Sequence, residues 1–179
     1  LAARPRPRPR GPGRGRRRAG RRGLRRAVRL RHARAGGVAP DDDEAQIAFA
    51  LALSVTAPPH DKTYAYQLKG AAILEPIFKR QPRHPGVAHY LIHLYDYPPI
   101  AEKGIDAARR YAEIAPAAPH ALHMPSHIFT RVGYWKDSIA TNAASARAAR
   151  ASKEWQDELH AMDYLVYAYL QLGQDKNAL

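Results

Sequence analysis

The sequence predicts an all-α fold in which antiparallel helical hairpins stack into a right-handed superhelical α-solenoid. From residue 44 onward, apolar residues recur at spacings of three and four, which is the period of an amphipathic helix. Glycine or proline interrupts this pattern at short, regular intervals, and no convincing alternating strand is visible. The chain also matches itself when it is shifted along its own length, as expected for stacked repeats.

Residues 1–40 form a tail of different composition, which we expect to be disordered. The tail holds 15 Arg, no Lys and no acidic residue, so it accounts for the chain's formal net charge of +13. A stretch of Arg, Pro, Gly and Ala buries too little apolar surface to offset the entropy of ordering. One hypothesis for the tail is non-specific, salt-dependent binding of nucleic acid. The arginines that would carry it are Arg14, Arg16, Arg17, Arg18, Arg21 and Arg22.

The alternative is that the tail is inert or artefactual. Arg, Pro, Gly and Ala are encoded by GC-rich codons, and an out-of-frame stretch has this composition. Single-strand binders usually add aromatic side chains for base stacking, and the tail has none. Nucleic acid is therefore expected as a partner only if the tail is a genuine part of the protein.

The body, residues 41–179, begins with acidic residues that suit the first turn of a helix. The expected helices span 44–57, 62–80, 85–96, 100–114, 120–132, 135–150 and 157–172, with a further start at 174. Short links predict that neighbouring helices pack antiparallel. Because Leu179 falls inside the last expected helix, we expect the chain to be truncated at its C-terminus.

Self-comparison defines the repeat. A shift of 34 residues, the period of the tetratricopeptide hairpin, superposes His89 on His123 and His93 on His127. A longer shift superposes Gly133 on Gly173, and a short insertion near 151–156 explains the difference. A glycine that ends one helix with positive φ before the next begins fits this hairpin pattern. The sequence thus predicts a tetratricopeptide-like (TPR-like) solenoid over residues 41–179.

Three histidine-rich segments add a resemblance to a known family. They read HPGVAHYLIH at 84–93, HALHMPSHIF at 120–129 and LHAMDYL at 159–165. Over about residues 41–179 they resemble a family of bacterial tetratricopeptide-repeat proteins of unassigned biochemical role. The resemblance implies a helical-repeat fold and a scaffolding or binding role, and it carries over no catalytic residue. We expect a soluble protein of the bacterial cytoplasm or periplasm.

The histidines are the candidate functional residues. The pairs His89/His93 and His123/His127 are spaced i, i+4, so each pair shares one helix face. If the first helix of each hairpin lines a concave groove, these pairs form a ladder along it. The predicted groove residues are His89, His93, His120, His123, His127, His160, Asp163 and Tyr167.

The first functional hypothesis is a non-enzymatic scaffold whose groove binds a protein or peptide segment, without a cofactor. The second is a transition-metal site, possibly enzymatic, since neutral imidazoles and carboxylates are ligands for Zn, Ni, Cu and Fe. Its predicted ligands are His89, His93, His123 and His127, with His160 and Asp163 as a further rung and Asp96 or Glu44 as a possible acid.

A third interpretation is structural, because stacked His and Tyr side chains can satisfy one another between helices. Pro125 bears on all three interpretations. A helix that starts at Pro125 would leave His123 outside it, and the His123/His127 pair would no longer be aligned.

Composition excludes several classes of function. The chain contains no Cys, which rules out disulfide frameworks, thiolate metal sites and a Cys nucleophile. Its longest apolar stretch, 47–57, is too short to span a bilayer, so no membrane span is expected. No glycine-rich phosphate loop or dinucleotide fingerprint is present.

Overall fold

The computed structural model describes residues 41–179. The predicted disordered tail and its six candidate arginines lie outside the described residues. Residues 41–179 are helical and contain no strand, which confirms the all-α class for this part. The elements are α2 (Asp43–Thr56), α3 (Ala65–Arg80), α4 (Pro85–Tyr95), the 3₁₀-helix η1 (Pro98–Gly104), α5 (Ile105–Ile114), α6 (Pro119–His123), α7 (Pro125–Val132), α8 (Trp135–Ser152), α9 (Trp155–Gln171) and α10 (Asp175–Ala178).

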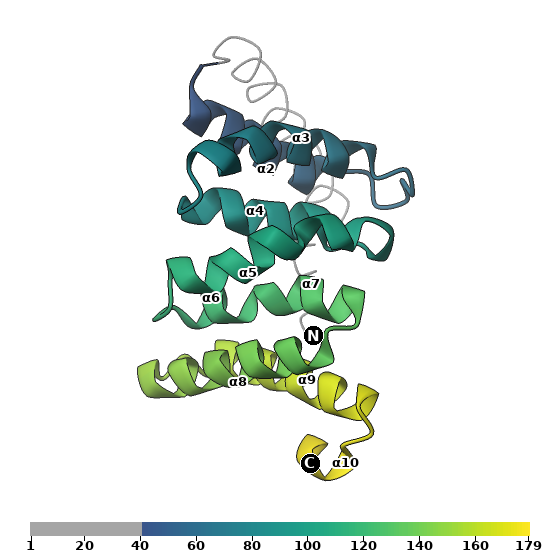
Figure 1. Cartoon of the computed structure of the whole chain (residues 1–179), viewed down its shortest axis with the longest axis vertical. Coiled ribbons are helices and arrows are strands. Elements are labelled where there is room, and N and C mark those ends of the chain that lie inside the picture. Colours follow the sequence, from purple (N-terminus) through teal and green to yellow (C-terminus); the bar gives the residue numbers. More distant parts are fainter. Residues whose placement is uncertain (1–40) are drawn as a thin grey trace, which may run out of the picture.

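Helices that follow one another in the chain pack against one another. Figure 1 shows them stacked from α2 and α3 at one end to α10 at the other. Contacts also join helices that do not follow one another in the chain, since α4 touches α7 and α6 touches α9. Histidine-bearing segments that are about one repeat apart in sequence therefore lie side by side.

Large apolar side chains fill the core between α2 and α7. Leu74, Ile92, Leu94, Met124 and Ile128 are completely or almost completely buried there. The interfaces between α8 and its neighbours are packed differently. Small and polar side chains are buried in it, namely Ala149, Ala161, Ala168, Ser138, Asn142 and Ser145.

Most expected helices are present, with shifted ends. The helix expected at 62–80 begins only at Ala65, because Tyr64 takes a left-handed backbone conformation with φ of 55°. The helix expected at 100–114 is a 3₁₀-helix up to Gly104 and α-helical after it. The insertion expected near 151–156 lengthens α8 and α9 instead of forming a loop, and Lys153, with φ of 63°, makes the turn between them.

The helix expected at 120–132 is divided at Met124. Pro125 has no N–H to donate, so α6 ends at His123 and α7 starts at Pro125. Met124 nevertheless keeps right-handed helical dihedrals, φ −52° and ψ −37°. The path of the helix therefore continues across the break, and His123 stays above His127.

The glycine punctuation is confirmed. Gly133 caps α7 with φ of 77°, and Gly173 follows α9 with φ of 66°. Both values lie in the left-handed region that glycine enters without strain. Along residues 41–179, no helix has both the length and the apolar character that crossing a bilayer requires.

Candidate functional site

Six histidines from four helices meet in one cluster. His89 and His93 come from α4, His120 and His123 from α6, His127 from α7 and His160 from α9. Burial is graded across the cluster. His123 is buried with 2% exposure, His89 and His127 are half-buried, and His93, His120 and His160 are exposed. The cluster is thus closed on the side of His123 and open to solvent at His93, His120 and His160.

The proton of His123 can be assigned from its surroundings. The buried side-chain amide of Asn142 donates from Nδ2 to the carbonyl oxygen of Ser138 at 2.8 Å. Its Oδ1 therefore faces His123, whose Nδ1 lies 2.7 Å away. Because Oδ1 can only accept, Nδ1 of His123 must donate. When His123 is neutral, its Nε2 is left as an unprotonated nitrogen.

His127 is oriented in the same way by a carboxylate. Its Nδ1 lies 2.9 Å from Oδ2 of Asp96, and Nε of Arg131 donates to the other oxygen of Asp96 at 2.8 Å. Burial on its own would raise the pKa of Asp96, but the hydrogen bonds and charges of His127 and Arg131 outweigh it and lower that pKa. The Asp96 carboxylate is thus an acceptor, and neutral His127 also presents an unprotonated Nε2.

These two Nε2 atoms face each other at 3.0 Å. Two unprotonated nitrogens cannot hydrogen-bond to each other, so the arrangement requires either a proton shared between them or a cation. Imidazole nitrogens bound to one zinc ion at 2.0–2.1 Å in tetrahedral geometry lie about 3.3 Å apart. One nitrogen each of His123, His127 and His160 lies within 4.8 Å of the other two. This group of three, called the inner trio below, has the donor type and spacing of a metal site.

The lowered pKa values of histidines in the cluster favour neutral metal ligands. Burial is the largest cause that lowers the pKa of His123, and of His89, to about 4 from an ordinary value of 6.5. Burial also lowers the pKa of His93 and His120. Neutral imidazole is the form that coordinates a metal, so ligands of this kind need not lose a proton near neutral pH.

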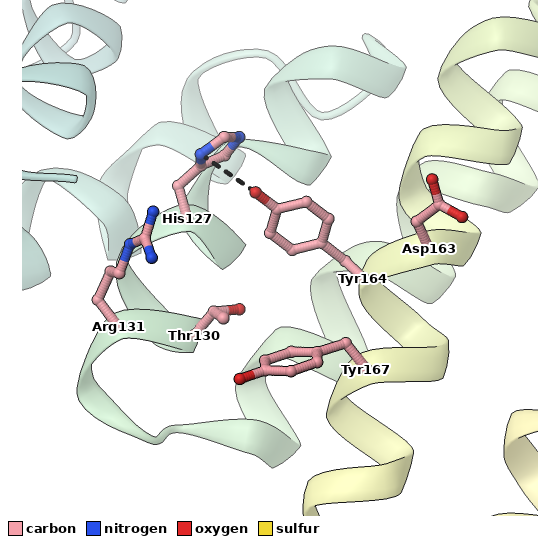
Figure 2. A pocket seen from close by; sticks show the side chains of 6 residues that line it. All are labelled: His127, Thr130, Arg131, Asp163, Tyr164 and Tyr167. Carbon is pink, nitrogen blue, oxygen red and sulfur yellow. Dashed lines mark hydrogen bonds between the residues drawn. The ribbon is translucent and has the colours of Figure 1, made fainter. Parts of the chain in front are cut away.

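A cavity of about 270 Å³ opens beside the inner trio. Figure 2 shows Tyr164 reaching from α9 toward His127, with its hydroxyl 3.4 Å from Nδ1 of His127. The cavity is lined by His127, Thr130, Arg131, Asp163, Tyr164 and Tyr167. Trp135 packs edge-on against Tyr167, with ring centroids 5.7 Å apart.

The structure divides the predicted ladder into two parts. All six predicted histidines enter the cluster, whereas Asp163 and Tyr167 line the neighbouring cavity. The predicted metal set of His89, His93, His123 and His127 does not meet at one point. The third residue of the inner trio is His160, and Asp96 is the acid that holds His127, whereas Glu44 bonds to His84 instead.

Sequence reasoning missed two members of the site. Asn142 stands four residues after Ser138 in a helix otherwise rich in small residues, and this was the signal available for it. Tyr164 is one of ten tyrosines in the chain, and no motif sets it apart. Its ring stands edge-on to that of His123 with centroids 4.7 Å apart, and burial raises the pKa of its hydroxyl.

Comparisons of the chain with protein-family models, with curated proteins and with solved structures give no match. The resemblance to tetratricopeptide-repeat proteins therefore stays a prediction from the sequence. What the chain does has to be inferred from the geometry of its own histidine cluster.

Proposed function

We propose that this protein binds a transition-metal ion at the inner trio, His123, His127 and His160. One observation carries the proposal. Asn142 and Asp96 each hold a histidine by Nδ1, so that two Nε2 atoms face each other at 3.0 Å with a third imidazole in reach. Second partners of this kind fix the tautomer and the ring orientation of metal-bound histidines in general.

The donor set indicates the class of ion. Three neutral nitrogens without a thiolate suit Zn, Cu, Ni or Fe rather than Ca or Mg, which prefer oxygen. Three protein ligands leave a coordination position for water or a ligand. The adjoining cavity gives such a ligand access from the side of Tyr164. Metal ions in sites of this type can activate water.

The scaffold for this site is, in our proposal, a tetratricopeptide-like stack of helical hairpins. Its support is the 34-residue match of His89 with His123, the packing of consecutive helices, and the contacts of α4 with α7 and of α6 with α9. In a stack of this kind, equivalent faces of successive hairpins lie side by side. A histidine repeated at equivalent positions then becomes part of a cluster.

The first test is the metal content of the full chain, purified without a histidine tag or chelator and then dialysed against Zn²⁺. We expect at least one tightly bound equivalent in the wild type. His160→Ala should bind one equivalent less, because it removes an exposed ligand at little cost to the fold. Bound metal should also stabilise the fold, by about 2.7 kcal/mol at a free ion concentration a hundred times the Kd.

His60→Ala is the matched control, since His60 is exposed and outside the cluster. It should bind as much metal as the wild type. If the wild type retains no metal after reconstitution with Zn²⁺, Cu²⁺ or Ni²⁺, the proposal is wrong, and the two facing nitrogens share a proton instead.

A second candidate function is the binding of a protein or peptide segment, which the sequence favoured. The observation in its favour is the cavity lined by two tyrosine rings and the Arg131 guanidinium, because tyrosine and arginine side chains commonly anchor protein interfaces. Selection of a displayed peptide library on the full chain tests it. Genuine groove ligands should be lost in Tyr167→Ala but kept in the exposed control His60→Ala.

A further inference from the structure

The ring of Tyr164 packs against all three histidines of the inner trio. Its centroid lies 4.7 Å from that of His123, 5.3 Å from that of His127 and 5.4 Å from that of His160. It meets the rings of His123 and His160 edge-on, at interplanar angles of 89° and 70°. Edge-on pairs at such distances stabilise aromatic clusters beyond the burial of their surface. One side chain of α9 therefore contacts the trio residues of α6, of α7 and of its own helix.

The three histidines have unequal support without this ring. His123 and His127 are each held at Nδ1 by a hydrogen-bond partner. His160, in contrast, is exposed and packs against the rings of His123, His127 and Tyr164. Tyr164 stands four residues after His160 in α9, so the two side chains share one helix face. Because Tyr164 is not one of the three proposed ligands, it can be changed without removing a donor nitrogen.

The hydroxyl of Tyr164 contributes less than the ring. It lies 3.4 Å from Nδ1 of His127, which is longer than a well-formed hydrogen bond. That nitrogen carries the proton that it donates to Asp96, so the hydroxyl can accept from it but cannot donate to it. Burial, with the charge of Asp96 as a second cause, raises the pKa of the Tyr164 hydroxyl. At neutral pH the metal-free chain therefore presents a neutral phenol beside the trio.

Tyr164 also forms the wall between the inner trio and the adjoining cavity. Of the trio, His127 lines that cavity, whereas His123 and His160 are not among its lining residues. Figure 2 shows the Tyr164 ring projecting from α9 toward His127 along the edge of the cavity. Removing the ring would join the cavity to the trio. Water in the cavity would then reach an ion bound there.

We propose that Tyr164 is a positioning residue of the metal site, whose ring holds the imidazoles of the inner trio in ligating orientation and shields the ion from the cavity. This inference rests on the proposed function, because it needs an ion at the inner trio. It goes further by assigning part of the metal affinity, and the rate of metal release, to a residue that supplies no donor atom. The aromatic ring carries this role and the hydroxyl does not.

The test compares Tyr164→Ala with Tyr164→Phe in the full chain loaded with Zn²⁺. Competition with a chromogenic chelator measures affinity, and rapid mixing with excess chelator measures the release rate. Tyr164→Ala should bind as many equivalents at saturation, but about 10–100-fold more weakly, as found for residues that orient metal ligands, and should release Zn²⁺ faster. Tyr164→Phe should match the wild type in both. So should the matched control Tyr169→Ala, which removes a tyrosine of α9 that lies outside the histidine cluster and the cavity.

The visible spectrum of the Co²⁺-loaded chain gives a readout that a general loss of stability would not change. Its bands depend on the coordination geometry, so Tyr164→Ala should shift them and Tyr164→Phe should not. Tyr164→Leu, which keeps apolar bulk without a ring, replaces Tyr164→Ala if that variant folds poorly.

Two results would overturn the role of the ring while the wild type still binds metal. One is equal affinity, release rate and spectrum in the wild type and Tyr164→Ala. The other is an equal loss in Tyr164→Ala and Tyr164→Phe, which would make the hydroxyl the group that matters. A wild type that binds no metal would instead overturn the proposed function, and this inference with it.

Discussion

The two ends of the body are held together by different means. From α2 to α7 a continuous cluster of large apolar side chains fills the space between helices, with Leu74, Ile92 and Leu94 at its centre. From α8 onward the buried side chains are alanines, serines, Asn142 and Glu158. Several large apolar residues of α9 stay exposed, including Leu159 at 63% and Leu170 at 51%. The apolar end is stabilised by burial, whereas α9 depends on close approach of small residues and on polar contacts.

The histidine cluster lies at the boundary between these two ends. His123 and His127 belong to segments that reach into the apolar core through Met124 and Ile128, and His160 belongs to α9. An ion bound by the inner trio would join α9 to the apolar end. The histidine cluster thus lies where the core of large apolar side chains gives way to small and polar ones, and four measurements test this contrast.

The largest expected effect is from truncating a core residue of the apolar end. Leu74→Ala should lower the free energy of unfolding by about 2–5 kcal/mol, because Leu74 is completely buried and a cavity would remain. In the other end, Ala149→Gly should cost only roughly 1 kcal/mol, mainly through helix propensity. Urea denaturation of both variants measures the contrast, and equal losses would contradict it.

The second effect is on local opening. In the metal-free chain, backbone amides of α9 should exchange with deuterium faster than those of α4, because α9 buries fewer apolar contacts. Zn²⁺ should slow exchange in α9 by the binding free energy, up to about 2.7 kcal/mol at a hundred times the Kd. His160→Ala should abolish this protection. Protection by Zn²⁺ that persists in the variant would show that the ion does not bridge to α9.

The third effect is on metal affinity through Asp96. Asp96→Asn keeps a hydrogen-bond acceptor near His127 but removes the charge, so Zn²⁺ affinity should fall about 10–100-fold. Asp163→Asn is the matched control, because that carboxylate lines the cavity without bonding to a histidine in the described part of the chain. Competition with a chromogenic chelator measures both affinities, and an equal fall in both variants would remove the special role of Asp96.

The fourth effect is on stability against pH in the metal-free chain. The folded pKa of His89 and His123 is about 4, below the ordinary value of 6.5, so the unfolded chain binds more protons between these values. Stability should be complete above about pH 6.5 and fall as the pH drops toward 4. Asp96, whose pKa is lowered, adds a further loss at more acid pH. Urea midpoints at several pH values, with chelator present, measure the slope, and a rise on acidification would contradict it.

The helices could be predicted because proline and glycine mark their ends and the apolar period marks their bodies. The pairing of His123 with His127 could also be predicted, although Pro125 argued against it. The break does not disturb the alignment of His123 with His127, because Met124 retains helical dihedrals. That local geometry depends on the packing of completely buried Met124, which spacing alone does not reveal.

The choice of the third ligand could not be predicted in this way. The sequence offers both His160 and Asp163 as a further rung of the ladder, but ring contact with His123 comes from His160 and Tyr164. The reason is that α9 begins at Trp155 and its rotation about its own axis is set by contacts with α8. The role of Asn142 could not be predicted for a similar reason. Its amide reaches His123 only because α8 packs against α6.

The residues of the inner trio lie on successive layers of the molecule, so the proposed metal site would have a mechanical property. Bending the body between α7 and α9 would change the separation of His127 and His160, and an ion held by both would oppose that change. Pulling on α9 would therefore raise the rate at which the ion is released. Conversely, the occupancy of the site would set how far this end of the protein flexes under load.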